Sequence, residues 1–245
     1  MKKLITFSLI ILSCLILYST IDFSKNGHAL EGILNSSSGE LPFSKGERLM
    51  YDVKLNGVTI GSSILTFYGE KEINGKAAHH INFYTLIPSL KDSEDIYGDT
   101  ESFLPMEVHR NLKKKLGFNE TIIEVYDQEN FRIDITSKSK LRSRKLSIER
   151  DAPVHNPILL SYFCRAKASF TKEDSFDITL SRTKFQVYYD GKKEIKTPLG
   201  KQLAHVFTSD PKKFTLYLSD DDRKTPLMID SPGTLGYSLV IRSIE

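Results

Sequence analysis

The most concentrated group of charged side chains in this 245-residue sequence is an acidic turn. Asp220, Asp221 and Asp222 follow one another, and Arg223 comes next. Carboxylates crowded into one loop are ligands that Ca²⁺ prefers. The turn has no glycine, however, which favours a charged hairpin turn in which one aspartate caps backbone amides and Arg223 pairs with another. We keep these four residues as candidate ligand or partner residues and predict no metal site.

A second group of candidates is basic. Lys138, Lys140, Arg142 and Arg144 alternate with serine and leucine, and alternate residues of a strand project to one face. Such a face could contact an anionic lipid or a polyanionic glycan. The other interpretation is a charged edge strand that discourages sheet-to-sheet aggregation. Aromatic residues do not interleave with these bases, which argues against single-stranded nucleic acid as a partner.

The patterns typical of catalysis are weak. Four acidic residues stand close together in the sequence: Glu94, Asp95, Asp99 and Glu101. With residues 220–222 they could provide paired carboxylates for hydrolysis of an envelope polymer, although acidic residues in a connecting loop are the commoner case. The sequence contains no histidine or cysteine spacing typical of zinc and no nucleophile elbow. We therefore predict no catalytic residue and no cofactor.

The segments that would carry these residues are mostly short strands. In residues 48–55 the odd positions are apolar, which indicates a half-buried strand. The pairs Asn56-Gly57, Asn74-Gly75 and Asp190-Gly191 are typical of two-residue hairpin turns. Gly61 indicates a bulge or a close approach of backbone. Continued along the chain, these patterns predict roughly ten to twelve short strands.

One segment has helical spacing instead. Apolar residues recur in this way over residues 157–167, with Asn156 placed to cap the helix and Pro157 suited to its first position. Strands do not alternate with helices, which argues against a parallel α/β sheet. The expected fold is mainly β: a single antiparallel barrel, or a strongly curved half-barrel sheet, with one or two short helices.

The N-terminus has the pattern of an export signal. Two lysines precede an apolar run over residues 4–17, and small residues at 27 and 29 suit a cleavage site. We divide the chain into a signal peptide (1–29), a linker (30–44) and one β-rich domain (45–245). An uncleaved membrane anchor is an alternative, since the apolar stretch approaches the length of a span. Lipidation of Cys14 is a third.

Charge and cysteine content limit the partners of the mature domain. Residues 1–29 hold three of the 34 basic and one of the 31 acidic residues, so the remainder carries a formal net charge of +1. A general attraction to nucleic acid is not supported. Cys164 is the one cysteine after residue 29, so no disulfide within the mature chain can form.

The order of several motifs resembles an exported bacterial family, domain of unknown function 3108 (DUF3108). The opening Gly46-Glu47-Arg48-Leu49-Met50-Tyr51-Asp52-Val53 is similar to its first strand, and 57–62, 97–105, 156–157, 197–200 and 216–236 are similar to later landmarks. The resemblance covers about residues 44–242. Tyr217 stands where a tryptophan is expected, and Asn156 where an aspartate is expected. The family implies an exported, β-rich envelope protein and provides no catalytic residues to carry over.

We therefore expect a non-catalytic periplasmic protein that binds a lipid, a glycan or a protein partner. Contact with a membrane would occur only through the leader or the basic residues. The alternatives are a carboxylate-dependent hydrolase of an envelope polymer, a purely structural interaction module, and a membrane-anchored form that faces the periplasm. The sequence does not indicate the oligomeric state.

Overall fold

The computed structural model describes residues 40–172, 175–231 and 237–245. Within these ranges, fourteen strands form one antiparallel sheet and there is one α-helix. The elements are β1 (Arg48–Leu55), β2 (Val58–Ile73), β3 (Lys76–Ile87), β4 (Leu90–Asp99), β5 (Pro105–Lys114), β6 (Glu120–Asp127), β7 (Arg132–Ser139), β8 (Ser143–Glu149), α1 (Pro157–Ala166), β9 (Ser175–Thr179), β10 (Lys184–Thr197), β11 (Gly200–Asp210), β12 (Thr215–Ser219), β13 (Pro226–Ser231) and β14 (Tyr237–Ile244). The proposed signal peptide and most of the linker lie outside the described residues.

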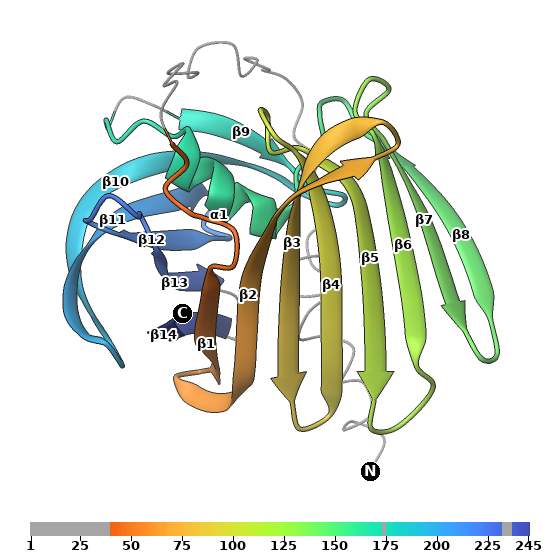
Figure 1. Cartoon of the computed structure of the whole chain (residues 1–245), viewed down its shortest axis with the longest axis horizontal. Coiled ribbons are helices and arrows are strands. Elements are labelled where there is room, and N and C mark those ends of the chain that lie inside the picture. The colour runs from red at the N-terminus through yellow and green to blue at the C-terminus, as the bar shows by residue number, and fades with distance from the viewer. Residues whose placement is uncertain (1–39, 173–174, 232–236) are drawn as a thin grey trace.

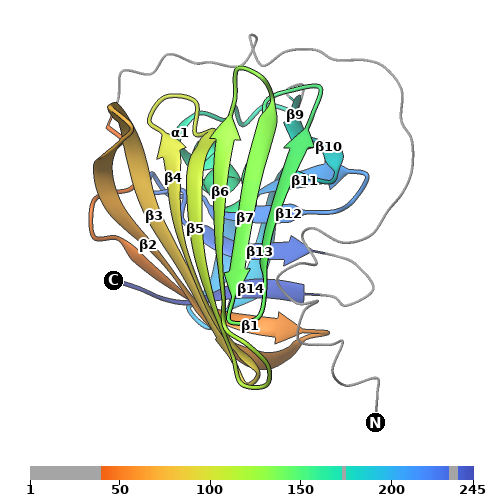
Figure 2. The ribbon, with the colours of Figure 1, turned by 90° about the vertical axis from the view of Figure 1, so that its right-hand side faces the viewer.

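The sheet is strongly curved and open. Its strand order runs from β8 down to β1, then to β14 and down to β9, so β8 and β9 form its two ends. We call β1–β8 and β9–β14 the two arms of the sheet. The arms bend towards each other around α1, which lies in the hollow between them (Figure 1). Seen from the side, β10–β13 run across the direction of β5–β8 (Figure 2). The expected half-barrel with a short helix is confirmed.

The core fills the space between the arms and α1. Leu49, Tyr51 and Val53 of β1 are all fully buried, which confirms the period-two alternation predicted for this strand. They join residues of both arms and the helical Leu159 in one apolar cluster. Phe43, which the sequence assigned to the linker, also packs in this cluster. The domain interior therefore begins before the first strand.

Two of the three predicted hairpin turns are confirmed. Asn56 and Gly57 have φ angles of 49° and 79°, and Asn74 and Gly75 have φ angles of 53° and 77°. A type I′ turn needs positive φ at both central residues, and asparagine and glycine adopt it at low cost. Gly61 also has the expected close approach, since a Cβ there would clash with the carbonyl oxygen of Leu86.

The third hairpin prediction is wrong. β10 continues through Asp190-Gly191 as one strand of 14 residues, and the turn to β11 lies at residues 198–199. Gly191 has a φ of 94°, and the register with β11 shifts between Tyr189 and Gly191. A glycine with positive φ serves a β-bulge as well as a turn. The dipeptide therefore bends β10 rather than ending it.

The helix begins where the sequence predicted. The side-chain oxygen of Asn156 accepts hydrogen bonds from the amides of Ile158 and Leu159, which satisfies two of the free N–H groups at the helix start. Leu159 is fully buried against β4, where a Cβ on Gly98 would lie 2.6 Å from its side chain. The glycine lets the helix approach the sheet closely.

A buried ion pair fixes the other end of α1. The guanidinium of Arg165 donates to both carboxylate oxygens of Glu47, at 2.7 and 2.8 Å, and to the carbonyl oxygens of Pro42 and Arg223. It also lies over the ring of Phe43, 4.9 Å from its centroid. The Arg165 side chain has no exposed surface, so the pairing offsets the cost of burying its charge. Glu47 thus joins the start of β1 to the helix.

Candidate functional site

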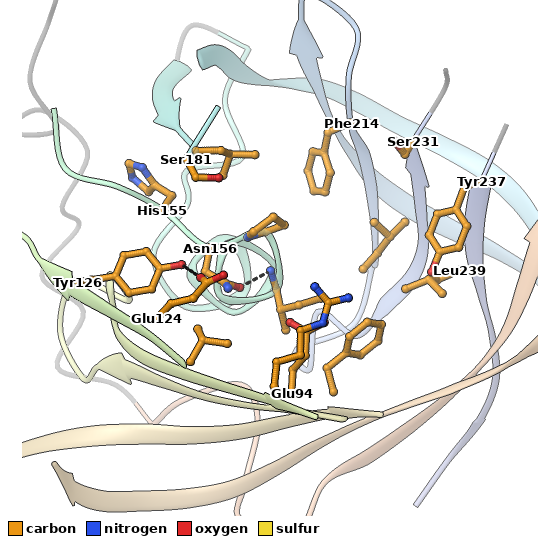
Figure 3. Close-up of a pocket in the computed structure, with 17 residues that line it drawn as sticks. Glu94, Glu124, Tyr126, His155, Asn156, Ser181, Phe214, Ser231, Tyr237 and Leu239 are labelled. Atoms are coloured by element: carbon orange, nitrogen blue, oxygen red, sulfur yellow. Dashed lines mark hydrogen bonds and ion pairs between the residues drawn. The ribbon is translucent and has the colours of Figure 1, made fainter. Parts of the chain in front are cut away.

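A cavity of about 100 Å³ lies in the hollow of the sheet, beside the first turn of α1 (Figure 3). Both arms contribute to its walls, with β3–β6 on one side and β13 and β14 on the other. It is partly enclosed. Its lining residues are Phe83, Glu94, Val108, Arg110, Glu124, Tyr126, His155, Asn156, Pro157, Ile158, Leu180, Ser181, Phe214, Ile229, Ser231, Tyr237 and Leu239.

Strand register brings a charged cluster to one end of the cavity. Glu94 on β4 lies directly opposite Arg110 on β5, and Asp92 is two residues before Glu94 on the same face. The Nη2 and Nε atoms of Arg110 donate to the two carboxylate oxygens of Asp92, at 2.5 and 3.0 Å. The Nε atom also lies 3.4 Å from the carboxylate of Glu94. The guanidinium is thus shared by two carboxylates of one strand.

The next strand adds a third carboxylate to this end. The Tyr126 hydroxyl donates to Glu124 at 2.5 Å, and it also hydrogen-bonds to the side chain of Asn156. Figure 3 shows Glu94, Glu124 and Tyr126 directed towards the same space. Because Asn156 caps α1, the polar end of the cavity and the start of the helix are parts of one hydrogen-bonded network.

Burial changes the acidity of this cluster. Burial, opposed by Arg110 and assisted by the neighbouring carboxylates Asp92 and Glu124, raises the pKa of Glu94 to about 7. Burial also raises the pKa values of Asp92 and Glu124, although hydrogen bonds from Arg110 and Tyr126 oppose this. The pKa of Arg110 is raised despite its burial, because carboxylates surround it. Glu94 therefore changes protonation near neutral pH.

The rest of the cavity wall is mostly apolar. Phe83, Val108, Leu180, Phe214 and Leu239 are all buried. His155 lines the cavity too, and burial lowers its pKa to about 4, so its ring is neutral at physiological pH. An apolar wall with convergent polar groups at one end is the usual character of a small-molecule site.

The connector before α1 covers one end of this hollow. Val154 forms an isolated bridge with Thr179 at the end of β9. The side chain of Gln128 donates to the carbonyl oxygens of Val154 and Pro105 and accepts from the Val154 amide. The amide of His155 donates to the Thr179 carbonyl oxygen. These bonds hold His155 and Asn156 against the cavity.

The predicted basic face is not a single strand. Lys138 lies near the end of β7, Lys140 and Arg142 lie in the turn, and Arg144 is on β8. Lys138 pairs with Ser143 and Arg144 with Ser137, so Lys138 and Arg144 project to opposite faces. The prediction that all four share a strand face is wrong, because a hairpin reverses the chain within the run. All four side chains are exposed around this hairpin.

The acidic turn makes internal contacts. Asp220 pairs with Lys192 at 2.6 Å and with His205 at 2.8 Å. Asp221 accepts from the Ser219 hydroxyl and from the amides of Arg223 and Lys224. Asp222 and Arg223 are exposed, and the Arg223 carbonyl oxygen accepts a hydrogen bond from the guanidinium of Arg165. Across the described ranges, no group of three or more His, Cys, Asp or Glu side chains is arranged to hold a metal ion.

The four acidic residues between 94 and 101 are separated by the structure. Glu94 and Asp95 lie in β4 and point to opposite faces, and Asp95 hydrogen-bonds to His80. Asp99 ends the strand and accepts from the amides of Glu101 and Ser102. Glu94 alone among the four lines the cavity, and none of residues 220–222 does. These two acidic groups do not form one site around the cavity.

The sequence interpretation missed Arg110, Glu124 and Tyr126. A signal for them was present: in β5 and β6 these residues occupy the alternate positions that also carry the apolar residues Val108 and Ile122. Charged residues at inward positions of adjacent strands indicate a buried polar site.

Within the described part of the chain, no helix is long and apolar enough to cross a membrane.

Comparison with protein families agrees with the motif order. No curated protein matches the sequence. A search of solved structures found the crystal structure of a β-barrel-like protein of domain of unknown function DUF1849 from Brucella abortus, with 8% sequence identity and a TM-score of 0.49, covering 82% of this chain and 97% of that chain. The family described as "Protein of unknown function (DUF3108)" matches residues 50–240, and the chain therefore belongs to that family.

Proposed function

We propose that this protein is a non-catalytic binding protein of the cell envelope that binds a small amphipathic molecule in the cavity beside α1. The observation that carries the proposal is the position of this cavity, partly enclosed by the two arms of the sheet and the capped start of the helix. Its wall combines apolar side chains with a polar cluster at one end, which would orient such a ligand.

The size of the cavity favours binding over hydrolysis of a polymer. An apolar cavity of about 150 Å³ can hold benzene, so a volume of about 100 Å³ suits an alkyl group of a few carbons. With the head group at the polar end, the first carbons would fill the cavity, and the rest of a longer alkyl chain such as hexyl would extend out through its open side. A hydrolase remains a second candidate because Glu94, with a pKa of about 7, has the acidity that a general acid needs near neutral pH.

The location of this function would be the periplasm. The apolar leader supports export, with the membrane-anchored form as the alternative. The exposed basic hairpin around Lys138–Arg144 would then be available to anionic lipid, glycan or an envelope protein. Export would bring the cavity close to the amphipathic molecules of the envelope.

A titration of the purified domain with n-hexanol tests the proposal. Amide chemical shifts of residues around the cavity should move with hexanol, and Ile229→Phe should reduce the affinity at least about tenfold because the new ring occupies the cavity. Ile148→Phe is the matched control, since Ile148 is likewise partly buried but does not line the cavity. Shifts that appear elsewhere, or equal affinities for the two variants, would reject the cavity as the binding site.

A further inference from the structure

The charges around the cavity are unbalanced. Three carboxylates, those of Asp92, Glu94 and Glu124, surround the single guanidinium of Arg110. The remaining titratable residues of the lining, Tyr126, Tyr237 and His155, bring no positive charge at neutral pH. Two negative charges are therefore uncompensated when all three carboxylates ionise. Burying an unpaired charge is costly, so the site would gain from a positive group supplied by a ligand.

The two glutamates also have free capacity to accept hydrogen bonds. Asp92 takes the Nε and Nη2 donors of Arg110, which leaves Glu94 with the longer contact of 3.4 Å to Nε. Glu124 receives the Tyr126 hydroxyl on one of its oxygens. A carboxylate can accept about four hydrogen bonds. Among the described residues, these contacts are the ones that Glu94 and Glu124 make through their side chains.

We infer that Glu94 and Glu124 bind the ammonium group of an amphipathic primary amine, whose alkyl part occupies the apolar end of the cavity. This inference rests on the proposed binding function and names the class of ligand. An ammonium group has three donors and a positive charge, which match two glutamates on β4 and β6, the strands on either side of β5. An anionic head would instead approach three carboxylates, and a neutral hydroxyl would leave the charge imbalance in place.

The inference also sets the direction of the pH dependence. The charged and titratable groups at the site are Asp92 and Glu94 on β4, Arg110 on β5, Glu124 and Tyr126 on β6, His155 before α1 and Tyr237 on β14. Glu94 loses its proton near pH 7, whereas an alkylammonium keeps its proton until about pH 10. Affinity for the amine should therefore rise between about pH 5 and about pH 8.

The experiment compares n-hexylamine, n-hexanol and hexanoate, which share one alkyl chain and differ in the head group. At about pH 8 the amine should bind at least about tenfold more tightly than hexanol, and hexanoate should bind most weakly. Glu94→Gln and Glu124→Gln should each lose most of this preference while they keep hexanol binding, which also shows that the variants fold. Asp95→Asn, on the opposite face of β4, is the matched control and should keep the preference.

The outcomes separate the two proposals. If none of the three compounds binds, both the proposed function and this inference fail. If hexanol and hexanoate bind as tightly as hexylamine, the binding function stands and the inference is overturned. Equal amine affinity at about pH 5 and about pH 8 would also overturn the inference, and this measurement needs no variant. Amine binding that survives both glutamine substitutions would place the ammonium elsewhere, with the same consequence for the inference.

Discussion

Replacing Glu94 by glutamine should make the protein more resistant to unfolding at alkaline pH. The ordinary pKa of a glutamate side chain is 4.5, and burial raises that of Glu94 to about 7. Each pKa unit corresponds to about 1.4 kcal/mol, so ionising Glu94 costs about 3 kcal/mol more in the folded protein than in the unfolded chain. Glutamine has nearly the shape of the protonated acid and cannot ionise.

The sign of the effect follows from the direction of the shift. Because the pKa of Glu94 is raised on folding, its favourable contribution is complete below the unfolded pKa and is lost as the pH rises through about 7. The free energy of unfolding of Glu94→Gln, relative to wild type, should therefore grow by about 2–3 kcal/mol between about pH 5 and about pH 8. Asp92 and Glu124 titrate in both proteins, so much of their contribution cancels in the difference.

Urea unfolding followed by circular dichroism at the two pH values measures this difference. Glu72→Gln is the control, because Glu72 lies exposed on β2 and the substitution likewise removes one negative charge. Its stability should follow that of the wild type at both pH values. A Glu94→Gln protein with the same pH dependence as the wild type would show that Glu94 is solvated, and the buried cluster would then be wrong.

Three further predictions concern the fold and the leader. Glu47→Gln should lower the free energy of unfolding by about 3–5 kcal/mol, because it leaves the buried Arg165 unpaired, and a loss below about 1 kcal/mol would contradict that pairing. Val53→Ala should cost about 1–3 kcal/mol in chemical denaturation, whereas the half-buried Lys54→Ala should cost less than about 0.5 kcal/mol, and equal costs would contradict the strand register. Residues 1–45, fused to a reporter active only outside the cytoplasm, should give signal, and a silent fusion would argue against export.

Local rules predicted those parts of the fold that local chemistry determines. Asn56-Gly57 makes a turn because both residues accept positive φ, and Asn156 caps α1 because its side chain reaches the first amides of the helix. Asp190-Gly191 carries the same signal as a turn, but its partner strand β11 pairs with residues on both sides of it. Whether a glycine with positive φ forms a turn or a β-bulge depends on that distant pairing, which a local pattern does not contain.

The site was harder to predict because its strands do not resemble ordinary strands. β4 reads Leu-Lys-Asp-Ser-Glu-Asp-Ile-Tyr-Gly-Asp, and the inward Asp92 and Glu94 interrupt the apolar alternation by which β1 was recognised. β5 has the same interrupted alternation, with Arg110 between the inward Val108 and Leu112. The register across β4–β6 brings Arg110 between these carboxylates, so the buried guanidinium finds its partners on a neighbouring strand and not on its own. A buried charge within an otherwise apolar face is therefore the sequence signal to look for, and its partners must be sought on the neighbouring strands.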